Sequence, residues 1–125
     1  MTKQQFKDKV IENVAQIVNY IANHEYAKLH TVTNIKTSLY GDEVTLEMIG
    51  GWLDEQLKIC SEYENKEFVI DAFEEEYFKI LELKDNKAFA YFNPHSHHEE
   101  LDFVFEFDFI MDDNGNITSE FSVNI

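Results

Sequence analysis

Two stretches of the chain carry apolar residues at the three- and four-residue spacing of a helix with one buried face. The first predicts a helix over about residues 3–23, with a stripe of Phe6, Val10, Val14, Ile17 and Ile21. The second predicts a helix over about residues 45–63 with Thr45 as its N-cap, and a buried face of Leu46, Ile49, Trp52, Leu53, Leu57 and Cys60. Gly50 and Gly51 lie inside this second helix, which indicates a close helix contact or a bend there. Residues 24–43 between the helices are predicted to form a loop with a short helical turn.

From about residue 67 the pattern changes to the alternation of apolar and polar residues that is typical of strands. Residues 77–83 and 88–93 flank a short turn and predict a hairpin. Residues 101–111 alternate between phenylalanine-rich and acidic positions, and residues 117–125 form a partner strand after the turn at 112–116. Residues 68–73 fit either a helix or a strand.

Helices followed by a run of strands predict an α+β fold in a single domain over residues 1–125. We expect two N-terminal helices packed on one face of a four- to five-stranded antiparallel sheet. A chain of this length buries roughly two thirds of the surface that its unfolded form exposes. No stabilising disulfide is needed for such a domain.

The charge narrows the classes of function. The chain has 25 acidic residues and 10 basic ones, a formal net charge of −15, and every basic residue is lysine. After Lys87 there are acidic side chains but no basic ones. Without arginine or a basic stripe, nucleic-acid binding is not expected.

A cytoplasmic location fits the remaining composition. Cys60 is the single cysteine and cannot form an intramolecular disulfide; on the apolar face of its predicted helix we expect it to be a buried core residue. No stretch approaches the roughly 18 apolar residues that a membrane-spanning helix needs, and the N-terminus does not read as a secretory signal. No membrane contact and no cofactor are therefore expected.

The segment PHSHHEE contains the candidate metal ligands His95, His97 and His98, next to Glu99 and Glu100. Imidazole and carboxylate groups suit zinc or nickel. On an extended segment, however, His95 and His97 point the same way and His98 points the opposite way. A solvent-exposed loop is the favoured interpretation. The turn at 112–116 does not match a calcium loop, because Ile110 and Phe121 would occupy positions that require acids.

Asp102, Glu106 and Asp108 are predicted to share one face of the strand at 101–111, opposite its phenylalanines. With Glu99 and Glu100 at the entrance of the strand, they are the candidate partner-binding residues. Such a face attracts a basic protein, raising the association rate and selecting against wrong partners. No catalytic residues are proposed.

The order of elements, a helix carrying LEMIGGWLDEQL followed by hairpins that end in FDFIMDDNGNITSEFSVNI, resembles two groups of proteins. In outline it is similar to the cone-shaped nuclear-transport-factor-like architecture, and it resembles small acidic bacterial immunity proteins. The second resemblance implies a non-enzymatic, antitoxin-like protein that neutralises a basic toxin such as a nuclease. The alternative is a cone-shaped small-molecule binder or enzyme with an aromatic pocket between helices and sheet.

Overall fold

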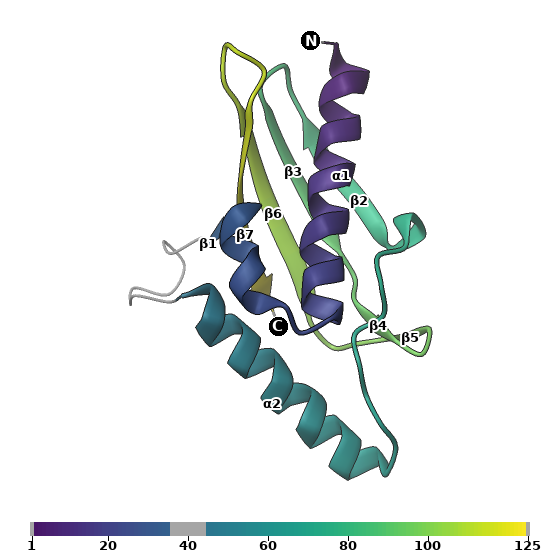
Figure 1. Cartoon of the computed structure of the whole chain (residues 1–125). Helices are drawn as coiled ribbons and strands as arrows, with labels where there is room; N and C mark the ends of the chain where they lie inside the picture. Colours follow the sequence, from purple (N-terminus) through teal and green to yellow (C-terminus); the bar gives the residue numbers. More distant parts are fainter. Residues whose placement is uncertain (1, 36–44, 125) are drawn as a thin grey trace.

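The structure, a computed structural model, describes residues 2–35 and 45–124 (Figure 1). Its elements in chain order are helix α1 (Lys3–Ala22), the 3-10 helix η1 (Tyr26–Thr31), strand β1 (Asn34–Ile35), helix α2 (Leu46–Glu64), the 3-10 helix η3 (Glu75–Tyr77) and strands β2 (Phe78–Leu83), β3 (Lys87–Phe92), β4 (His95–Ser96), β5 (Glu99–Glu100), β6 (Val104–Met111) and β7 (Ile117–Asn124). None of the helices in these two ranges combines the length and the apolar character needed to cross a membrane.

Five strands form one mixed sheet in the order β1-β7-β6-β3-β2. The α+β prediction is confirmed, but the prediction of a purely antiparallel sheet is wrong at one edge, where β1 pairs in parallel with β7. The sequence pattern did not reveal β1, because a strand of two residues is too short to show alternation. The remaining neighbours in this sheet are antiparallel.

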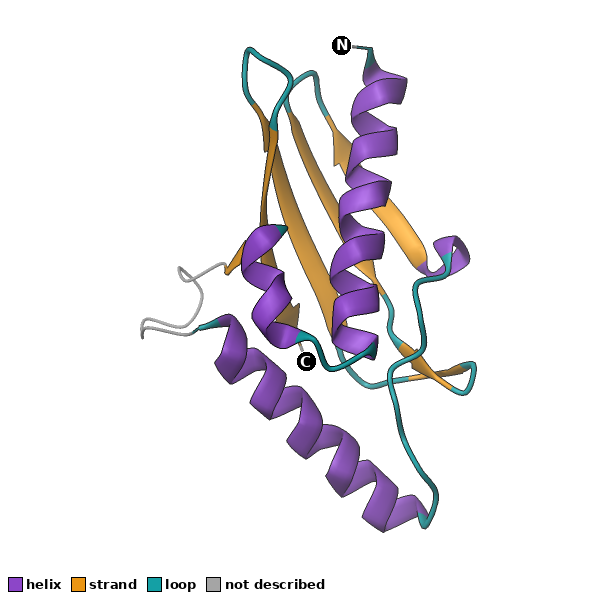
Figure 2. Cartoon of the chain, in the orientation of Figure 1, coloured by secondary structure: helices purple, strands orange, loops and turns teal. Residues whose placement is uncertain are grey.

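Helix α1 matches its predicted range closely. Its N-terminus has a capping box, in which the Thr2 hydroxyl accepts the Gln5 N–H at 3.1 Å and the Gln5 side chain accepts the Thr2 N–H at 2.8 Å. The predicted apolar stripe is fully buried against the sheet. Helix α1 therefore covers one face of the sheet, which we call the inner face (Figure 2).

Helix α2 also lies where the sequence predicts it, and Thr45 caps it by accepting the Met48 N–H at 3.1 Å. Its position differs from the expectation of two helices on one sheet face, because α2 crosses beyond the end of the sheet (Figure 1). It packs on η1 through Gly50, which lies against the Tyr26 ring. Trp52 meets Phe103 edge-on, with ring centroids 5.7 Å apart.

Both predicted hairpins are present, formed by β2 with β3 and by β6 with β7. Strand β6 begins at Val104 rather than at residue 101. Residues 68–73, which fitted either pattern, form neither a helix nor a strand. The small hairpin of β4 with β5 was not predicted.

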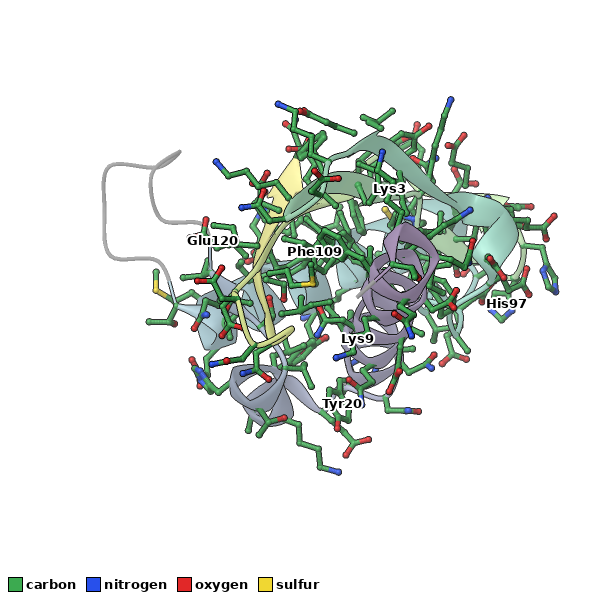
Figure 3. The ribbon with its side chains drawn as sticks, turned by 90° about the horizontal axis from the view of Figure 1, so that it is seen from above. Lys3, Lys9, Tyr20, His97, Phe109 and Glu120 are labelled. Carbon is green, nitrogen blue, oxygen red and sulfur yellow. The ribbon has the colours of Figure 1, made fainter. Side chains whose placement is uncertain are left out.

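Phenylalanines fill the space between α1 and the inner face. Phe109 lies on the side of the sheet that faces α1 (Figure 3). It belongs to a set of inward-facing rings that are each at most 1% exposed, namely Phe92, Phe105, Phe107, Phe109 and Phe121. The alternation predicted for the β6 segment is thus confirmed. Cys60, predicted to be buried in the core, is only partly buried.

Candidate protein-binding face

The opposite face of the sheet, here called the outer face, carries the side chains that alternate with the buried phenylalanines. The strand registers assign to it Lys79, Glu82, Lys87, Phe89, Tyr91, Val104, Glu106, Asp108, Ile110, Thr118, Glu120, Ser122 and Asn124. Among them Ile110 is 56% exposed. Leu81, at the irregularity in β2, is 53% exposed. Large apolar side chains therefore remain in contact with solvent on this face.

Acidic groups concentrate on the β6–β7 half of the outer face. Glu106 lies between Tyr91 of β3 and Ser122 of β7, and it accepts a hydrogen bond from the Asn124 amide at 2.9 Å. Asp108 lies between Phe89 and Glu120. Asp108 and Glu120 are thus directly opposite each other, an arrangement of like charges that does not help a sheet to form.

Lysines lie on the other half of this face. Lys79 and Lys87 come from β2 and β3. In the adjoining turn, the Lys84 ammonium contacts the Glu82 carboxylate at 2.7 Å. The face is therefore divided, with acidic groups toward β7 and mixed charge toward β2. A partner that matches it must carry positive charge on the side that meets β6 and β7.

Three open hollows follow β3 across the outer face. The middle one, of about 360 Å³, is lined by Leu81, Phe89, Tyr91, Asn93, Val104, Glu106 and Asn124. It shares Phe89 with a hollow of about 330 Å³ that includes Asp108 and Glu120. It shares Tyr91 and Asn93 with a third, of about 290 Å³, that includes Glu100. Because neighbouring hollows share lining residues, they lie next to one another along β3, and we call this row of three hollows the trough.

The five predicted partner-binding acids occupy different environments. Glu106 and Asp108 project from the outer face, and Glu100 lines the end of the trough. Glu99 lies on the β4–β5 hairpin and forms an ion pair with Lys66 at 3.0 Å. Asp102 is exposed in the loop before β6, so it does not share the strand face as expected.

Sequence reasoning missed Glu120 as a member of the acidic surface. It alternates with the buried Ser119 and Phe121, so the pattern of β7 already placed it away from the core. The signal that could have found it is the turn at 112–116, because a hairpin turn fixes which residues of its two strands face each other.

The histidine-rich segment forms the β4–β5 hairpin rather than a plain loop. His97 and His98 occupy its turn with φ values of 50° and 67°, and the Asp71 carboxylate accepts their backbone N–H groups at 2.9 and 2.8 Å. His95 is instead nearly buried, with its ring stacked on Tyr77 at 3.5 Å between centroids. Within residues 2–35 and 45–124 no three His, Cys, Asp or Glu side chains are grouped to hold a metal ion. His97 lies on the opposite side of the molecule from Glu120 (Figure 3).

Two tyrosines have pKa values above the usual range. Tyr26 donates a hydrogen bond to Asp54 at 2.6 Å, and His24 Nδ1 lies 3.0 Å from the same carboxylate oxygen. Burial, together with this hydrogen bond and the Asp54 charge, raises the pKa of Tyr26. Partial burial and the Glu76 carboxylate raise the pKa of Tyr77, which lines the trough. Both phenols therefore stay protonated at neutral pH and act as hydrogen-bond donors.

Comparisons with models of protein families, with curated proteins and with solved structures gave no match. The outer face combines partly buried aromatic side chains and exposed aliphatic ones with carboxylates. These are properties of a protein-binding surface.

Proposed function

We propose that this protein is a non-enzymatic binding protein whose outer face covers a basic protein partner. In its most specific form the proposal is an immunity protein that neutralises a basic toxin, for example a nuclease. One observation carries it. The registers of β6 with β3 and β7 bring Glu106, Asp108 and Glu120 together on the face opposite α1, beside Tyr91 and Phe89.

The two kinds of side chain have separate roles in such a complex. Carboxylates on one face steer a positively charged protein toward it, and this raises the association rate at low salt. Tyr91 and Phe89 supply contact area once the partner has docked, because aromatic side chains are enriched at interfaces and among the residues that dominate binding energy. The trough along β3 lets a projecting side chain of the partner enter between them.

The alternative of an aromatic pocket between helices and sheet needs space beneath α1. Phe105 and Phe107 are fully buried there, and Phe109 is 1% exposed. The three hollows along β3 are lined by Phe89 and Tyr91 of the outer face and, at its β4–β5 end, by Tyr77. This packing favours a surface site over an internal one.

The test measures the association rate with the product of the neighbouring gene as the binding partner, because immunity proteins are encoded beside their toxins. A Glu106→Gln, Asp108→Asn double variant keeps side-chain size and removes two charges from the outer face. We expect its association rate at low salt to fall on the order of fivefold and its salt dependence to flatten.

A matched control variant also removes two negative charges, but from α1 on the other side of the sheet. Asp8→Asn with Glu12→Gln changes one Asp and one Glu that are exposed on α1. We expect this control to bind almost as fast as the wild type. Equal rates and salt slopes for all three proteins would exclude the outer face as the binding surface.

A further inference from the structure

Helix α2 has a second apolar stripe that points away from the core. It contains Met48, Ile59 and Tyr63, which are 56%, 51% and 87% exposed. The partly buried Trp52 lies on the same line. At 100° per residue, all four side chains fall within an arc of about 60° on the helix surface. The residues that α2 buries, such as Leu53 and Leu57, lie on a different side of the helix.

This stripe is separate from the proposed partner-binding face. Within residues 2–35 and 45–124, the other large apolar side chains that are strongly exposed are Leu81 and Ile110, both on the sheet. Single exposed apolar residues are ordinary, but a line of them along one helix marks an interaction surface. Methionine and tyrosine are also residue types that interfaces favour.

The positions in the stripe are symmetric about the centre of the helix. Met48 and Tyr63 are equally far from the point midway between Glu55 and Gln56, and so are Trp52 and Ile59. If a second α2 lies antiparallel on this point, each apolar residue meets an apolar residue of the second copy. We propose that the stripe is covered by a second copy of this chain, in a two-fold symmetric antiparallel pairing of the α2 helices. Such an isologous contact uses one patch twice and needs only this self-complementarity.

Charged residues beside the stripe fit the same arrangement. Two-fold symmetry places Lys58 next to Glu55 of the second copy, and the same contact occurs twice. Glu55 and Glu62 add negative charge within about 40° of the edge of the stripe, and each chain has a formal net charge of −15. Repulsion between copies therefore opposes the dimer at low salt and weakens as salt is added.

The size of the contact sets its strength. Helix α2 has 19 residues, so the strip is about 28 Å long and about 10 Å wide on each helix. An interface of this extent is at the small end of specific protein contacts. We expect a weak dimer that dissociates in the micromolar range or above.

Sedimentation equilibrium of the whole chain tests the inference, from about 1 µM to about 1 mM, which spans the expected dissociation range. The expected result is a monomer–dimer equilibrium that shifts toward the dimer as salt increases. Ile59→Glu should raise the dissociation constant at least about tenfold, because it places a charge at the contact. Leu81→Glu is the matched control, since Leu81 is equally exposed but lies on the sheet, and it should leave the equilibrium unchanged.

A mixing experiment tests the antiparallel register. Met48→Glu and Tyr63→Lys should each weaken self-association, whereas an equimolar mixture should form a heterodimer in which the two new charges face each other. A wild-type chain that stays monomeric at every concentration overturns the proposal. So does a dimer that Ile59→Glu leaves intact, or a mixture that does not associate more strongly than its components. None of these results depends on whether the outer face binds a basic partner.

Discussion

Gly50 and Gly51 are adjacent in α2, but an added methyl group meets different surroundings at the two positions. A Cβ atom at Gly50 would lie 2.5 Å from Cγ of Tyr26 and within 2.9 Å of two further ring carbons. At Gly51 there is no described neighbour within 4 Å of a Cβ atom. The two positions are therefore a matched pair for testing how α2 packs on η1.

The expected effects have opposite signs. Alanine is favoured over glycine inside a helix by about 0.5–1 kcal/mol, so Gly51→Ala should stabilise the protein by about that amount. Gly50→Ala gains the same preference, but carbon atoms prefer separations of about 3.5–4 Å. The Tyr26 ring must therefore move by about 1 Å, and its hydroxyl is held by Asp54. Overpacking of this kind costs about 1–3 kcal/mol, so after the gain in helix preference Gly50→Ala should destabilise the protein by up to about 2.5 kcal/mol.

Urea unfolding gives the change in free energy and thermal melts give the change in unfolding temperature, both followed by circular dichroism and Trp52 fluorescence. The unfolding temperatures of the two variants should move in opposite directions, by about 4 °C for each kcal/mol in a domain of this size. A double-mutant cycle isolates the contact. In a Tyr26→Ala background, Gly50→Ala should become stabilising, as Gly51→Ala is. If Gly50→Ala stabilises the protein as much as Gly51→Ala does in the wild-type background, the described packing of α2 on η1 is wrong.

Two further predictions concern turns. The Asp112 side chain accepts the Asn114 and Asn116 N–H groups at 2.9 Å, and the hydrogen bond from Asn116 is the main cause that lowers the Asp112 pKa. The stability that these hydrogen bonds contribute is fully present above pH 3.8, the ordinary pKa of aspartate, and is lost as the pH falls through the lowered pKa of Asp112. At pH 7, Asp112→Ala should therefore unfold at a lower temperature than the control Asp113→Ala. In thermal melts at a pH below the lowered pKa of Asp112, this difference should vanish. His97 and His98 occupy positive-φ turn positions that an Asn-Gly pair prefers. The double variant His97→Asn, His98→Gly should therefore stabilise the protein by about 0.5–1 kcal/mol in urea unfolding. A loss of stability would mean that the imidazoles make contacts that outweigh the turn strain.

Local patterns determined much of this fold. The spacing of Phe6 and Val10 predicted α1, and the hydroxyl of Thr45 marked the start of α2, because helix periodicity and capping depend on residues only a few positions apart. The alternation of Phe105 and Phe107 with Glu106 and Asp108 predicted which side chains are buried, because the side-chain period of a strand is two. A close helix contact was also one of the two alternatives predicted for Gly50 and Gly51. Its partner at Gly50, the Tyr26 ring, was not predicted.

The tertiary structure decided the arrangements that join distant parts of the chain. Asp71 supports the turn of the histidine hairpin from 26 residues away, and nothing near His97 in the sequence indicates it. The parallel pairing of β1 with β7 and the position of α2 beyond the sheet likewise depend on contacts between segments far apart in sequence. The acidic surface depends on both the sequence pattern and the tertiary structure. The alternation along the chain predicted that Glu106 and Asp108 share one face of their strand. Only the register of β6 with β7 showed that Glu120 lies opposite Asp108. A periodic pattern fixes the direction of a side chain relative to its own backbone, but its neighbours across the sheet are fixed by pairing and packing with the rest of the chain.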